Sequence, residues 1–72
     1  MAESRFLKLV HSAARRAAQT GDYLDAYRVA DELRAQDSGL NLTRRAAADN
    51  VIAAGLIYGA QMWIDPEPVP AS

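Results

Sequence analysis

The chain has 72 residues, a formal net charge of −1 and no cysteine. This length allows one domain, and a domain of this size buries only about 60% of the surface of its unfolded chain, so its own core is small. The lack of cysteine excludes disulfides and thiolate metal sites, and a single histidine, His11, argues against a zinc site. We therefore expect no metal and no cofactor, and oligomerisation remains as the way to stabilise the chain.

The first predicted element is an amphipathic helix over residues 5–19. Its apolar residues recur at intervals of three and four, which is typical of a helix with one buried face. The opposite face carries Lys8, Arg15 and Arg16, and residues 1–20 together have a net charge of +3. This basic face is a candidate for binding an anionic partner. Gly21 suits the left-handed position that ends a helix.

A second helix is predicted over residues 22–37. Asp22 is placed to cap its N-terminus and Asp25 to complete a capping box. A single turn residue would then join the two helices as an antiparallel hairpin. Residues 21–40 have a net charge of −3, and Asp25 and Glu32 are expected to face water. These two carboxylates are the candidate acidic surface for a protein partner.

A third, longer and more apolar helix is predicted over residues 43–64, followed by a flexible proline-rich tail over residues 65–72. Residues 51–64 contain no charged side chain, and Gln61 is their one polar residue. A helix that is apolar all round belongs inside a larger structure. One of its sides is a candidate oligomer interface formed by small and large apolar residues: Val51, Ile52, Gly55, Gly59, Met62 and Trp63.

Four environments for this helix remain open. A second copy of the chain, most simply in a dimer, is favoured, because two amphipathic helices cover only part of the apolar circumference. A different protein and burial within the chain are alternatives. A membrane is less favoured than a protein partner, since fourteen residues span roughly 21 Å, whereas a hydrocarbon core is about 30 Å thick.

The sequence thus predicts an all-α fold with a single helical domain over residues 1–64. No catalytic residues can be assembled, so we expect a non-enzymatic interaction protein that self-associates and binds or modulates a larger protein. This profile is typical of accessory factors, antitoxins and phage- or plasmid-type inhibitors. The first alternative is a DNA-associated regulator that uses the basic face, and the second is a membrane-anchored protein. The first residues resemble no signal peptide, so a cytoplasmic location is expected.

Overall fold

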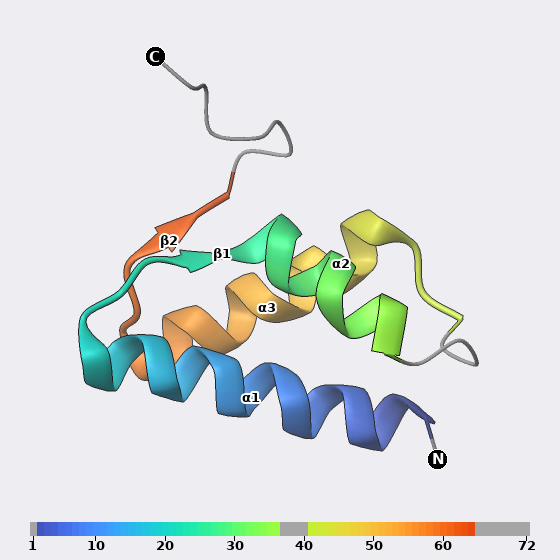
Figure 1. The fold of residues 1–72 in the computed structure, drawn as a ribbon, viewed down its shortest axis with the longest axis horizontal. Coiled ribbons are helices and arrows are strands. Elements are labelled where there is room, and N and C mark those ends of the chain that lie inside the picture. The colour runs from blue at the N-terminus through green and yellow to red at the C-terminus, as the bar shows by residue number, and fades with distance from the viewer. Residues whose placement is uncertain (1, 37–40, 65–72) are drawn as a thin grey trace.

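A computed structural model describes residues 2–36 and 41–64, and the side chains from residue 5 onward within these ranges. The chain forms three helices and one pair of two-residue strands (Figure 1). A helical domain is therefore confirmed, whereas the strand pair is new. The predicted tail over residues 65–72 lies outside the described residues. In chain order the elements are α1 (Ala2–Thr20), β1 (Leu24–Asp25), α2 (Ala26–Gln36), α3 (Arg44–Tyr58) and β2 (Met62–Trp63).

The start of α2 differs from its prediction. Asp22 does not cap this helix; its carboxylate instead accepts a hydrogen bond from the Thr20 hydroxyl at 3.0 Å. The cap is Asp25, whose Oδ1 accepts from the Arg28 backbone N–H at 3.2 Å. Residues 24–25 are extended because they pair in parallel with residues 62–63. The predicted one-residue turn is therefore wrong: five residues separate α1 from α2. The predicted last residue of α2, Asp37, lies outside the described residues.

The predicted end of the third helix at Ile64 is also wrong. The helix starts as expected, with the Thr43 hydroxyl accepting from the Ala46 N–H at 3.1 Å. It ends at Tyr58, because Gly59 adopts a left-handed conformation with φ of 71° and its N–H bonds to the Gly55 carbonyl. Glycine adopts this conformation without the steric penalty of a Cβ. The chain then turns back, and β2 pairs with β1.

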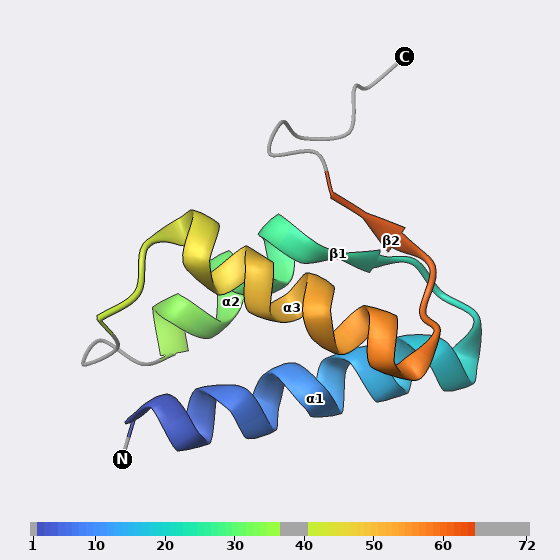
Figure 2. The ribbon, with the colours of Figure 1, turned by 180° about the vertical axis from the view of Figure 1, so that it is seen from behind.

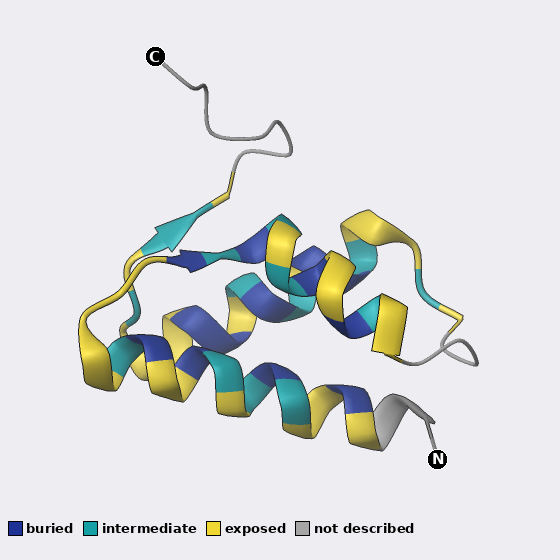
Figure 3. Ribbon diagram, in the orientation of Figure 1, coloured by how far each residue is buried: buried dark blue, intermediate teal, exposed yellow. Residues whose placement is uncertain are grey.

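The core lies where α3 packs against both α1 and α2 (Figure 2). Seven of the twelve buried apolar residues of the described chain are alanines. Alanines let helix axes approach closely but bury little apolar area per residue. The larger buried side chains are Phe6, Val10, Leu24, Leu33 and Val51. Figure 3 shows the buried positions on the inner faces of the helices and the exposed positions on their outer faces.

Arg44 links α2 to α3 at the surface. Its Nε donates to both carboxylate oxygens of Asp31, at 3.0 and 3.2 Å. The guanidinium also lies over the Tyr27 ring, 4.9 Å from the centroid. Within the described ranges, no helix combines the length and hydrophobicity needed to cross a membrane.

Candidate functional site

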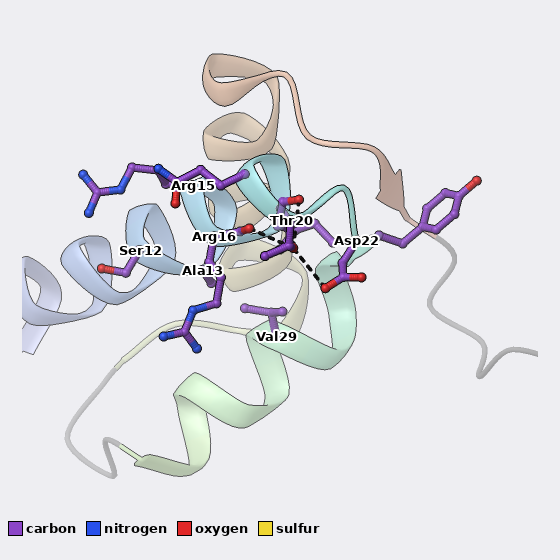
Figure 4. Close-up of a pocket in the computed structure, with 11 residues that line it drawn as sticks. Ser12, Ala13, Arg15, Arg16, Thr20, Asp22 and Val29 are labelled. Atoms are coloured by element: carbon purple, nitrogen blue, oxygen red, sulfur yellow. Dashed lines mark hydrogen bonds between the residues drawn. The ribbon is translucent and has the colours of Figure 1, made fainter.

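A groove of about 600 Å³ lies between the C-terminal half of α1, the connector into β1, and α2 (Figure 4). It exists because β1 inserts an extended segment between the two helices, so they are not joined by a tight turn. Its walls combine cationic, hydroxyl and apolar side chains. The lining residues are Ser12, Ala13, Arg15, Arg16, Ala17, Gln19, Thr20, Asp22, Tyr23, Leu24 and Val29.

The polar groups of the groove are arranged around Thr20. Its hydroxyl is within hydrogen-bond distance of the Arg16 carbonyl oxygen and of Asp22 Oδ2, both at 3.0 Å. Figure 4 shows Arg15 and Arg16 extending in different directions from α1. The groove therefore has cationic groups at its rim and one carboxylate, Asp22, at its end.

The predicted basic face is present on α1. Lys8, Arg15 and Arg16 are all exposed, and so is Arg5. In the described part of the chain, no ion pair or hydrogen bond involves the charged group of any of these four side chains. By contrast, Arg28 on α2 and Arg44 on α3 both contact carboxylates. The cations of α1 are thus available to an external anion.

The two residues of the predicted acidic surface have separate local roles. Asp25 is half-buried and caps α2. Glu32 is exposed, and its Oε1 lies 3.3 Å from Arg28 Nε, one helical turn away. Both carboxylates therefore already have a partner within α2, and the structure does not combine them into one patch.

The six residues predicted as an oligomer interface do not share one helix face. Val51 and Gly55 lie on the inner side of α3 and are buried by the chain itself. Ile52 is half-buried, and Gly59 is the exposed cap of the helix. Met62 and Trp63 belong to β2 and are half-buried. The predicted ridge depended on a helix continuing to residue 64, so the left-handed Gly59 removes it.

A different apolar surface appears on the outer side of α3. Leu56 is 71% exposed and Ile57 is 70% exposed, and Ala53 lies beside them on the same exposed side. We call these three residues the outer face of α3. Helical spacing places Ala53 and Ile57 opposite Val51 and Gly55, so the sequence indicates two apolar sides without showing which one faces the core.

His11 contacts Tyr58 where α1 meets α3. Its Nδ1 lies 3.0 Å from the Tyr58 hydroxyl, and the two rings meet edge to face with centroids 5.6 Å apart. The only histidine of the sequence is thus held in a contact between α1 and the last residue of α3. Among the described residues, no group of three or more His, Cys, Asp and Glu side chains is placed to hold a metal ion.

Comparison of the chain with protein-family models, with curated proteins and with solved structures found no match.

Proposed function

We propose that the chain is a non-enzymatic interaction protein that self-associates through the outer face of α3. The observation that carries this proposal is the distribution of large apolar side chains. The described chain buries five of them, yet it leaves Leu56, Ile57, Tyr23 and Ile64 each more than half exposed. Fully burying one such aliphatic side chain stabilises a protein by about 1.5–3 kcal/mol. A 72-residue domain with an alanine-rich core would therefore gain stability from covering these exposed side chains.

A second copy of the chain is the partner that the charge pattern favours. From Asn50 to Ile64 the sequence contains no charged residue. In a two-fold symmetric interface each side chain near the axis meets its own copy, so any charge there faces a like charge. Ala53, Leu56 and Ile57 carry no charge and so avoid this repulsion, while the exposed Asp49, one turn before Ala53, lies at the edge of the outer face.

The outer face of α3 is the centre of the proposed interface rather than its whole extent. A stable interface buries about 800 Å² on each partner, which exceeds what three side chains provide. Tyr58, 36% exposed, follows Ile57 directly and contacts His11 of α1. Leu7, 43% exposed, lies one turn before His11 on the same side of α1. The proposed interface therefore extends from α3 onto α1.

The non-enzymatic assignment is supported by the contacts of the polar residues. His11 is engaged with Tyr58, Asp25 caps α2, and Asp22 accepts from Thr20. Each has a structural partner. Binding of a larger protein, expected from the sequence, stays a prediction.

Sedimentation velocity of the full chain tests the proposal. The wild type should sediment with twice the mass of one chain, and the double variant Leu56→Glu/Ile57→Glu should sediment as a monomer with unchanged helical circular dichroism. Both side chains point to solvent, so the variant should fold. The control is Ala35→Glu/Gln36→Glu, which places the same two carboxylates at exposed residues of α2, away from the outer face of α3, and should remain a dimer. A monomeric wild type, or a double variant that still dimerises, would refute the assignment.

A further inference from the structure

The exposed side of α1 carries its cations in one narrow stripe. Arg5, Lys8, Ser12, Arg15 and Arg16 with Gln19 are all exposed; successive positions are three or four residues apart, except that Arg15 and Arg16 are adjacent. At 100° per residue these six positions fall within an arc of about 100° on the helix surface. No acidic residue lies on α1 between Arg5 and Thr20. We call this set of six residues the basic stripe.

The four charges of the stripe are grouped into two pairs. Arg5 and Lys8 lie near one end of α1, and Arg15 and Arg16 lie near the other. The pair centres are nine residues apart, which is roughly 14 Å at a rise of 1.5 Å per residue. The major groove of B-DNA is about 12 Å wide. A helix laid across the groove would therefore bring Arg5 and Lys8 to the phosphates of one strand. Arg15 and Arg16, which extend in different directions from the helix (Figure 4), would reach separate phosphates of the other strand.

The residue between the two pairs fits this arrangement. On the stripe, Ser12 stands between Lys8 and Arg15, and its short hydroxyl side chain does not keep the helix away from a surface. Hydroxyls and amides, such as those of Ser12 and Gln19, also donate hydrogen bonds to phosphate oxygens. From the spacing, the exposure and the lack of partners, we propose that the basic stripe of α1 binds the phosphate backbone of double-stranded DNA across the major groove.

The negative charges elsewhere in the described chain do not cover this stripe. Asp31 contacts Arg44, and Glu32 contacts Arg28, on α2 and α3. The exception is Asp22, which is exposed and lines the same groove as Arg15 and Arg16. Its negative carboxylate would repel a phosphate bound at that end of the stripe, so Asp22→Asn should strengthen DNA binding severalfold.

The salt dependence of binding to a labelled duplex of random sequence provides the main test. Neutralising four phosphates gives a slope of log affinity against log salt of about −3.6, which is a loss on the order of 150-fold between 50 and 200 mM salt. Arg15→Ala/Arg16→Ala should reduce the slope to about −1.8, since each lost phosphate contact reduces it by about one. The matched control, Arg28→Ala/Arg45→Ala, changes the net charge equally but leaves the stripe intact, so the slope should not change.

Several results would overturn the proposal. The first is no retention of the duplex at 50 mM salt. The second is an equal salt slope for the Arg15→Ala/Arg16→Ala variant and the wild type. The third is an affinity for single-stranded DNA, which has no groove to cross, equal to that for the duplex. Competition by polyglutamate as effective as that by duplex of equal charge would instead identify a site for acidic proteins. The inference is independent of self-association, because one protomer carries the complete stripe. Measuring DNA binding by the Leu56→Glu/Ile57→Glu variant in the same assay separates DNA binding from self-association.

Discussion

Gly55 occupies the closest contact between α3 and the strand pair. A Cβ at this position would lie 3.1 Å from Leu24 Cδ2 and nearer still to the Met62 sulfur. Leu24 and Met62 are paired residues of β1 and β2, so the missing side chain is what lets both strands pack on the helix. The sequence predicts Gly55 as a packing position against a second copy of the chain. Here its neighbours come from the same chain.

Gly55→Val should therefore destabilise the fold. The added side chain would displace Met62 and press on Leu24, and overpacking of this kind costs about 1–3 kcal/mol. Urea unfolding followed by circular dichroism measures the loss. Ala35→Val is the matched control, because it introduces the same β-branched residue at an exposed position of α2, outside the proposed interface, and should cost less than about 0.7 kcal/mol. Equal effects of the two substitutions would show that residue 55 is not tightly packed.

At the scale of elements, the contacts of Arg44 link α2 to α3, in addition to the packing of their alanines. Arg44 begins α3, and its guanidinium contacts both Asp31 and Tyr27 of α2. The side chains of Arg44 and Asp31 are 45% and 48% exposed, so solvent weakens the ion pair and its contribution stays below about 1 kcal/mol. Stacking on the tyrosine ring adds a contribution that depends on the planar shape of the guanidinium.

Arg44→Lys should accordingly behave more like Arg44→Ala than like the wild type. Lysine keeps the charge but not the flat group that lies over Tyr27, so we expect a loss of about 0.5–1 kcal/mol for lysine and slightly more for alanine. Thermal unfolding at low and high salt measures both losses. Arg45→Ala removes the adjacent exposed arginine and serves as the reference. Full stability of Arg44→Lys would mean that charge alone makes the link.

At the scale of the whole molecule, local sequence patterns predicted the three helices, while pairing between distant segments was not predictable from them. The apolar periodicity of residues 5–19 is a local signal, and the structure confirms the helix that it indicated. The strand pair joins Leu24 to Met62, and no pattern near either residue indicates that contact. This pairing shortens the third helix and delays the start of the second. It also buries the side of α3 assigned to an interface, so the candidate surface moved to Leu56 and Ile57.

Self-association predicts that the thermal stability of the whole molecule depends on its concentration. If folding and dimerisation are coupled, a tenfold rise in protein concentration adds about 1.4 kcal/mol per dimer. Dividing this added free energy by the unfolding entropy of two 72-residue chains gives an upward shift in Tm of about 4–5 °C. Scanning calorimetry over a hundredfold range of concentration measures the shift. The Leu56→Glu/Ile57→Glu variant should keep a constant Tm over the same range, because a monomer unfolds independently of concentration. An equally constant Tm of the wild type would contradict self-association through the outer face of α3.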